Sequence, residues 1–210
     1  NLDLWPKLTV FVSGLCGMAL EVLWIRLLVP SFNNSAYGFA AVLAIFLLGL
    51  GIGSYLTSKT KEASLFILGI FQTVVAILSF TGYLGFELTQ ILQVRYSDTT
   101  NFGVSPFLLV PLLEALFLLL PLAIVQGLIL PVAARLNPVS QSLGNSVGKL
   151  YFWNTLGAIF GTLMTGFWWI PVYQVQKSFL IVLAILLTSG AMLLIATTSS
   201  TWRFLSPALA

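Results

Sequence analysis

The chain has 210 residues, of which 59% are hydrophobic and only 7% are charged, whereas about 25% of residues are charged in a typical soluble domain. A soluble fold of this size cannot hide so much apolar surface, because every folded protein keeps a large accessible surface. The mean hydropathy of +1.03 agrees with this conclusion. The composition therefore predicts an all-α, polytopic membrane helix bundle that forms one domain over residues 1–210.

Several classes of chemistry are excluded by residue counts. The chain has no histidine and one cysteine, Cys16, so zinc sites, haem ligation, Ser-His-Asp catalysis and disulfides are not expected. The six acidic residues are scattered, and the net charge of +3 is not gathered in a basic run that would indicate nucleic acid. We expect no metal, no cofactor and no catalytic residue. The expected partners are the lipid bilayer and, as open alternatives, other membrane subunits or further copies of the chain.

Runs of about 20 apolar residues predict six transmembrane helices. They cover approximately residues 8–29, 36–56, 64–86, 106–134, 150–170 and 179–197. The first run contains charged residues and lacks a cleavage pattern, so it predicts a retained helix rather than a signal peptide. The third continues as a polar-faced extension to Arg95, followed by a loop over residues 96–105.

The fourth predicted span is expected to be bent or broken. Pro111, Pro121 and Pro131 recur in it at regular intervals, and each proline removes one backbone hydrogen bond.

The distribution of Lys and Arg predicts the orientation of the chain in the cell membrane. With both termini in the cytoplasm, the cytoplasmic ends hold more basic residues than the outer ends. The cytoplasmic set is Lys7, Lys59, Lys61, Arg135, Lys149 and Arg203, and the outer set is Arg26, Arg95 and Lys177.

The six spans divide into three plus three, which would give the second half an inverted topology of the kind common in transporters. Each half has a middle helix rich in aromatic residues and glycine, at residues 37–53 and 151–166. Two interpretations stay open: a true inverted repeat, or a similarity of composition between unrelated membrane helices.

Two glycine pairs are predicted to pack helices together. Gly49 and Gly53 lie one turn apart inside an apolar span, as do Gly157 and Gly161. Such pairs allow a second helix to approach closely. A nucleotide-binding loop would require a preceding strand and an aqueous cleft, so we expect Gly157 and Gly161 to face the first or second span inside the bundle.

Five polar side chains within the spans form the candidate intramembrane site. They are Glu21, Arg26, Glu114, Gln126 and Asn154. Ionisable residues within a membrane are costly and often functional. Structural alternatives stay open for each: an ion pair or snorkelling arginine in the first span, a solvated Glu114 near the interface, and an interhelical hydrogen bond made by Asn154.

Two long blocks of the sequence resemble one family. The first block contains Ser13-Gly14-Leu15, Glu21-Val22-Leu23-Trp24-Ile25-Arg26, Ala36-Tyr37, Ala40-Ala41-Val42-Leu43-Ala44 and Phe46-Leu47-Leu48-Gly49-Leu50. The second contains Leu130-Pro131, Val147-Gly148-Lys149-Leu150-Tyr151, Trp153-Asn154-Thr155-Leu156-Gly157-Ala158-Ile159, Gly161, Gly166-Phe167 and Ile170-Pro171. They are similar to the membrane half of the spermidine-synthase-like proteins, in which a transporter-like domain is fused to an aminopropyltransferase-like domain.

The resemblance implies a membrane domain without its own catalytic centre, because residues 198–210 are too few for the cytoplasmic Rossmann-type enzyme domain of that family. Whether the chain is a fragment of a longer protein or a separate homologue stays open. Three functions are compatible with the sequence: an anchoring membrane domain of such a protein, a pathway for polyamines or other cations that uses Glu21 and Glu114, and a structural subunit of a larger membrane complex.

Overall fold

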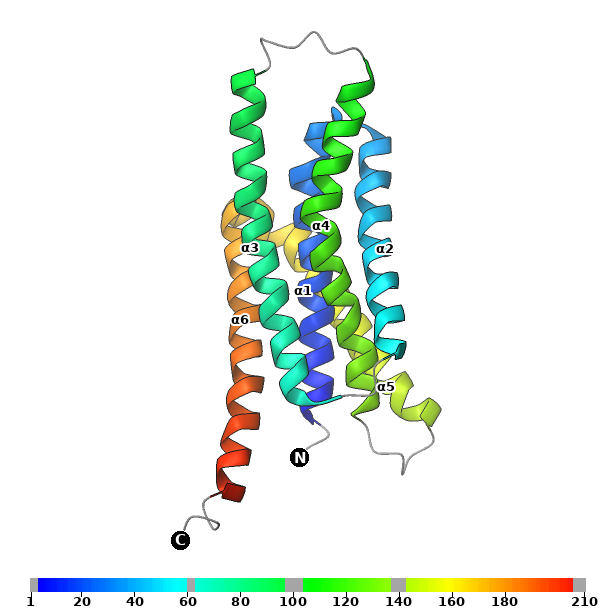
Figure 1. Cartoon of the computed structure of the whole chain (residues 1–210), viewed down its shortest axis with the longest axis vertical. Helices are drawn as coiled ribbons and strands as arrows, with labels where there is room; N and C mark the ends of the chain where they lie inside the picture. Colours follow the sequence, from blue (N-terminus) through cyan, green and yellow to red (C-terminus); the bar gives the residue numbers. More distant parts are fainter. Residues whose placement is uncertain (1–3, 60–62, 97–103, 137–142, 206–210) are drawn as a thin grey trace.

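The computed structural model describes residues 4–59, 63–96, 104–136 and 143–205, and in these ranges it contains helices and no strands (Figure 1). The α-helices are α1 (Leu4–Leu28), α2 (Ala36–Lys59), α3 (Leu65–Tyr96), α4 (Val104–Arg135), α5 (Leu143–Leu163) and α6 (Ile170–Leu205). Two shorter helices, η1 (Val29–Phe32) and η3 (Met164–Trp169), follow α1 and α5. The expected all-helical architecture is therefore confirmed.

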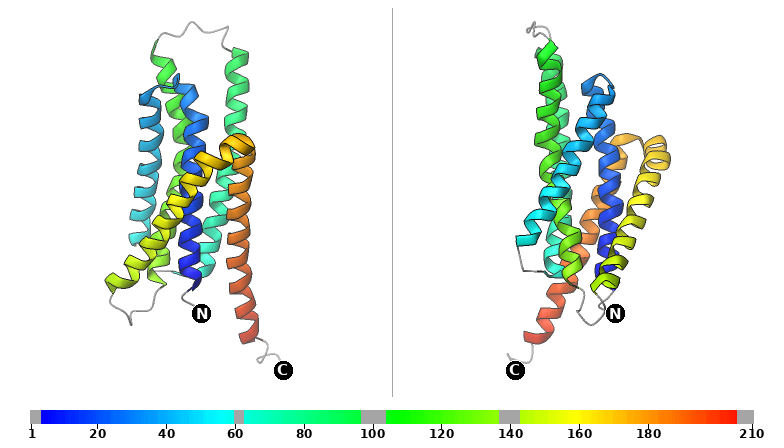
Figure 2. Two further views of the ribbon diagram at one scale, coloured as in Figure 1. Left: turned by 180° about the vertical axis from the view of Figure 1, so that it is seen from behind. Right: turned by 90° about the vertical axis from the view of Figure 1, so that its right-hand side faces the viewer.

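Five helical stretches are long and apolar enough to cross a membrane, one fewer than the sequence predicted. The difference lies at the C-terminal end, where one stretch of 52 residues, Val147–Thr198, includes both the fifth and the sixth predicted spans. Helical backbone continues from α5 through the π-helix η3 into α6 and is interrupted only at Gln174, in a short segment that also contains the polar residues Gln176, Lys177 and Ser178. The chain nevertheless turns back in this region, so that α5 and α6 run in opposite directions (Figure 2).

The turn between α5 and α6 depends on one strained residue. Gln174 has φ 65° and ψ 170° within an otherwise helical segment. This region of backbone conformation is almost restricted to glycine, because a Cβ atom clashes with the backbone there. The surrounding packing must therefore offset a cost of about 1–3 kcal/mol.

Gln174→Gly is expected to raise the stability of the protein modestly, because glycine adopts this conformation without the Cβ clash. The expected rise in the free energy of unfolding is about 1 kcal/mol, since the greater freedom of glycine in the unfolded chain offsets part of the gain. Reversible unfolding in mixed micelles measures it. Gln176→Gly, two residues further along α6, is the control and is expected to lower stability. A lower stability for Gln174→Gly would show that the backbone there is not strained.

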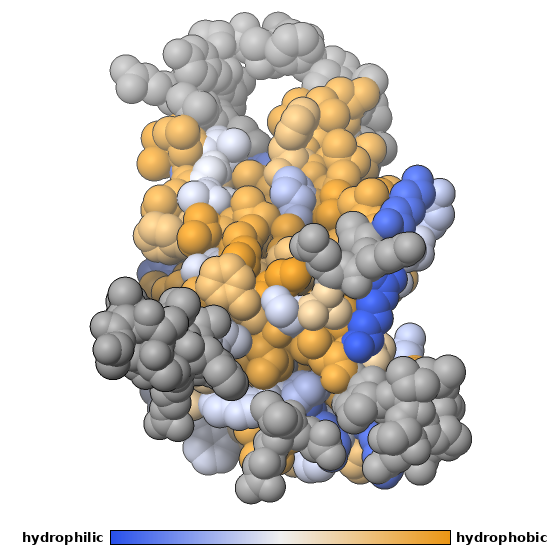
Figure 3. All heavy atoms as spheres, turned by 60° about the horizontal axis from the view of Figure 1, so that its bottom comes forward, coloured by the Kyte–Doolittle hydropathy of each residue, from blue (hydrophilic) through white to orange (hydrophobic). Residues whose placement is uncertain are grey.

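Helix α1 occupies the centre of the bundle (Figure 2). It contacts all five other α-helices, α5 most extensively and α3 least, whereas α3 packs mainly on α6 and α4. In its most apolar window 61% of the residues are buried, against 28% in α2. The outer surface of the bundle is mostly hydrophobic, as the space-filling view of one face shows (Figure 3). This arrangement, with apolar side chains both inside and outside, is that of a membrane protein.

Helix α4 is continuous through all three of its prolines, so the expected break is absent. Each proline removes one hydrogen bond, but neighbouring helices can compensate for such losses in a membrane bundle. The helices α3 and α4 also reach further than predicted, to Tyr96 and from Val104, so that both ends of the expected loop are helical. The rest of that loop lies outside the described residues.

Local signals in the sequence explain where two helices begin. The Ser35 hydroxyl accepts a hydrogen bond from the backbone N–H of Gly38 at 3.1 Å, and Ser64 does the same for Ile67 at 3.1 Å. Both are N-caps, which satisfy donors that have no partner in the first helical turn.

The start of α1 and the end of α6 lie at the same end of the bundle (Figure 1).

Candidate functional site

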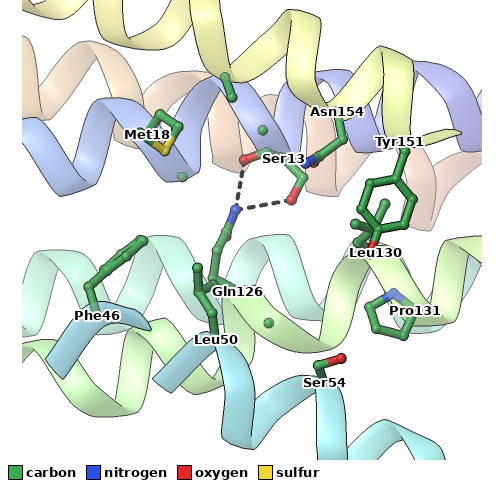
Figure 4. A pocket seen from close by; sticks show the side chains of 14 residues that line it. Ser13, Met18, Phe46, Leu50, Ser54, Gln126, Leu130, Pro131, Tyr151 and Asn154 are labelled. Carbon is green, nitrogen blue, oxygen red and sulfur yellow. Dashed lines mark hydrogen bonds between the residues drawn. The ribbon is translucent and has the colours of Figure 1, made fainter. Parts of the chain in front are cut away.

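A cavity of about 270 Å³ lies between α1, α2, α4 and α5. Figure 4 shows its lining, which includes the midpoint of α1 and combines apolar side chains with a few polar ones. The lining residues are Ser13, Gly14, Gly17, Met18, Phe46, Leu50, Ser54, Gln126, Gly127, Leu130, Pro131, Tyr151, Asn154 and Ala158. None of them is charged. The cavity therefore offers dipoles and apolar surface to a ligand, and no counter-ion.

Gln126 is the most constrained polar side chain of the cavity. The residue is only 8% exposed, and its Nε2 donates hydrogen bonds to the backbone oxygen of Ser13 at 2.7 Å and to Ser13 Oγ at 3.0 Å (Figure 4). Its Oε1 is buried and has no hydrogen-bond partner among the described residues. A buried acceptor without a partner is costly, by about 1–3 kcal/mol. Gln126 thus joins α4 to α1 and leaves one acceptor unused.

The other polar groups of the lining come from the two remaining helices. Asn154 and Tyr151 lie on α5, and Ser54 lies on α2. Asn154 is half-buried and lies beside Ser13 (Figure 4), whereas Tyr151 is exposed. Each of the four helices therefore supplies a polar side chain to one small volume.

Glycines hold α1 against α5 at backbone contact distance. A Cβ atom built on Gly157 would overlap the carbonyl oxygen of Phe11, and one built on Gly161 would overlap that of Leu15. On the α1 side of the same contact, a Cβ atom built on Gly14 would overlap the carbonyl oxygen of Asn154. Close approach of this kind requires the absence of side chains.

The same arrangement recurs between α2 and α4. A Cβ atom on Gly53 would overlap the carbonyl oxygen of Ile124, and one on Gly127 would overlap that of Leu50. Gly49 lies against Ala123, whereas Gly51, on the opposite side of α2, faces open space. The four glycines selected from the sequence thus lie at helix contacts on both sides of the cavity.

The ionisable candidates lie elsewhere. Glu21 is buried and Arg26 is exposed, and the structure shows no ion pair between them. Glu114 accepts a hydrogen bond from the Thr89 hydroxyl through Oε1, while its Oε2 is buried and has no partner among the described residues. It is separated from Gln126 by twelve residues, or about 18 Å along α4. Glu21, Arg26 and Glu114 do not line the cavity.

The structure brings together only two of the five predicted site residues, Gln126 and Asn154. Sequence reasoning missed Ser13 as the partner of Gln126, although a signal was present: Val12-Ser13-Gly14-Leu15 in α1 matches Val125-Gln126-Gly127-Leu128 in α4. In addition, no group of three or more His, Cys, Asp or Glu residues that could hold a metal ion occurs within the described ranges.

Comparison with known proteins adds no assignment. No protein family, curated protein or solved structure matches the chain.

Proposed function

We propose that the chain is a transporter-like membrane domain, in which two inverted halves, α1–α3 and α4–α6, enclose a binding site for a small molecule. The observation that carries this proposal is the lining of the central cavity, in which the two halves contribute matching positions. In many transporters the substrate site lies between inverted repeats near the middle of the membrane.

The match between the halves can be followed residue by residue on α1 and α4. Ser13 and Gln126, which are hydrogen-bonded to each other, are 113 positions apart in the chain. The same offset relates the remaining lining residues of these two helices, namely Gly14, Gly17 and Met18 to Gly127, Leu130 and Pro131. Because α1 and α4 run in opposite directions (Figure 1), these matches are those that an inverted repeat would give.

The second helix pair also matches, at an offset of 104 positions instead of 113 (154 − 50 = 104). Leu50 and Ser54 on α2 correspond to Asn154 and Ala158 on α5, and all four line the cavity. The glycine contacts also correspond, since Gly53 meets Ile124 as Gly157 meets Phe11. Only Phe46 and Tyr151 have no counterpart in the lining. Under this proposal α5 and α6 each cross the membrane, which gives six crossings and places both termini on one side, the cytoplasm.

The other functional hypotheses are proposals that fewer observations support. Membership of the spermidine-synthase-like proteins, with this chain as their non-catalytic membrane domain, rests on the sequence blocks alone. A route for polyamines or other cations would need carboxylates, and Glu21 and Glu114 do not line the cavity. A role as a structural subunit predicts stoichiometric partners on purification in mild detergent.

Cysteine labelling from the two sides of a vesicle tests the proposed function. In a Cys16→Ala background, Ser54→Cys and Ala158→Cys place thiols at corresponding positions of the cavity. Because a transporter opens its site to each side in turn, both thiols are expected to react with a membrane-impermeant reagent in right-side-out and in inside-out vesicles.

Phe117→Cys is the control, because Phe117 is 72% exposed on the outer surface of α4 and is expected to lie in lipid. It should not react in either orientation. Reaction of the cavity thiols from one side only, or from neither side, would contradict the transport proposal.

A further inference from the structure

We infer that the central cavity binds a small, uncharged molecule that donates a hydrogen bond to Gln126 Oε1, with urea-like and primary amide groups as the best chemical match. The inference rests on the proposed function, since it names the class of ligand that the site would carry. It is drawn from one buried acceptor without a partner, the charge of the lining and the size of the cavity.

The hydrogen bonds of Gln126 fix which end of its amide is free. The backbone oxygen of Ser13 can only accept a hydrogen bond, so the amide atom that faces it at 2.7 Å must be the nitrogen. The carboxamide oxygen is therefore the free atom, and it can only accept. Because Oε1 is buried in this structure, the carboxamide must turn toward the cavity for a ligand to reach it. A ligand then satisfies it with an N–H or O–H group, whereas a ligand that has acceptors alone leaves it unsatisfied.

The lining argues against a charged ligand. The fourteen residues that surround the cavity include no Asp, Glu, Lys or Arg. Moving a charge from water into such a site without a counter-ion costs far more than one hydrogen bond returns. An ammonium group could donate to Gln126 Oε1, but its charge would stay uncompensated. Neutrality of the ligand follows from the lining, and the need for a donor follows from Gln126.

The cavity also limits the size of the ligand. Its volume of about 270 Å³ lies just below the range of about 300–1,000 Å³ that is usual for drug-sized ligands. Ser13 Oγ and the Asn154 side chain lie near Gln126 and can accept or donate further bonds (Figure 4). Met18, Phe46 and Leu130 supply apolar contacts. A compact molecule that consists of little more than an amide-like polar group fits this cavity.

A series of four probes of one shape tests the inference. Acetamide, acetone, acetate and acetamidinium have similar planar heavy-atom frames and a reporter methyl group, and they differ in hydrogen-bonding groups and in charge. Saturation-transfer NMR on the purified full chain in detergent measures the binding of each. We expect acetamide to bind best and acetone about fivefold more weakly, which is the worth of one hydrogen bond. Acetate and acetamidinium should bind more weakly still, because each carries a charge.

Two variants of Gln126 sharpen the test. Gln126→Leu should reduce the affinity for acetamide to that of acetone. Gln126→Glu places a carboxylate at the same point, so the preference should move from acetamide to acetamidinium. Gln72→Leu is the matched control. Gln72 is also a buried glutamine, but its Nε2 donates to the Thr9 carbonyl, its Oε1 accepts from Ser189, and it does not line the cavity. Its loss should leave the order of the probes unchanged.

Four results would overturn the inference: equal binding of acetone and acetamide, strongest binding of acetamidinium by the unaltered protein, unchanged acetamide binding in Gln126→Leu, or no binding of any probe. The first two use the unaltered chain and do not depend on the folding of a variant. The ligand class and the transport proposal fail separately, since one-sided cysteine labelling leaves the binding results standing.

Discussion

Gly161→Leu is expected to lower the free energy of unfolding by about 1–3 kcal/mol, the usual cost of overpacking. Gly161 faces α1 so closely that even a Cβ atom would overlap the carbonyl oxygen of Leu15. Backbone atoms cannot rotate away as a side chain can, so the two helices must separate and lose contacts along their length. Reversible unfolding in mixed micelles measures the change.

Two controls distinguish this effect from a general sensitivity of the helices. Leu163→Ile, at a residue that is 47% exposed, should change stability little. On α2, Gly53→Leu should be as harmful as Gly161→Leu, because Gly53 meets the Ile124 carbonyl, while Gly51→Leu should be tolerated, because nothing lies near Gly51. Unaltered stability in Gly161→Leu would mean that this face of α5 looks outward.

Trp24→Ala is expected to cost about 3–5 kcal/mol, the usual range for the loss of a large buried aromatic side chain. Trp24 is fully buried on α1 and meets Phe179 of α6 edge-on, with ring centroids 5.4 Å apart. It also lies against Gly82 of α3, so its removal opens a void where α1 meets both helices. The midpoint of unfolding in mixed micelles reports the loss.

Trp24→Phe separates the packing of this residue from its polar group. The indole Nε1 is buried and has no hydrogen-bond partner among the described residues. Trp24→Phe therefore removes an unsatisfied buried donor, which is favourable, while it also reduces the volume of the side chain. We expect less than half the effect of Trp24→Ala. If both variants cost the same, the indole N–H would have to make a favourable interaction.

The class of the protein followed from its composition, but the number of spans did not. Apolar runs separated by polar residues locate helices well, because the membrane requires every backbone group to be bonded internally. The count differs because Val147–Thr198 forms one long helical stretch, although the chain reverses at Gln174, inside the interval that separates the fifth and sixth predicted spans. Polar residues mark this interval in the sequence, namely Gln174, Gln176, Lys177 and Ser178, whereas the positive φ of Gln174 has no compositional signal.

Only part of the candidate site could be predicted, because the sequence does not show how the helices pack against each other. Gln126 and Asn154 stood out as polar residues in apolar spans, and both line the cavity. Glu21 and Glu114 stood out equally, yet they face other parts of the bundle. Sequence shows which residues are polar, whereas the meeting of Gln126 with Ser13 depends on how α4 packs against α1.

The central position of α1 has a consequence for the way the protein is made. Its main partner, α5, leaves the ribosome roughly 140 residues later, which at about 5–20 residues per second means a delay of roughly 7–30 s. During that interval α1, which carries Glu21, must be retained in the bilayer by its own hydrophobicity, by the insertion machinery and by α2 and α4, which contact it and are made before α5. The most buried helix thus waits for its main partner during biosynthesis, and substitutions that make it more polar should reduce the yield of inserted protein before they affect the finished fold.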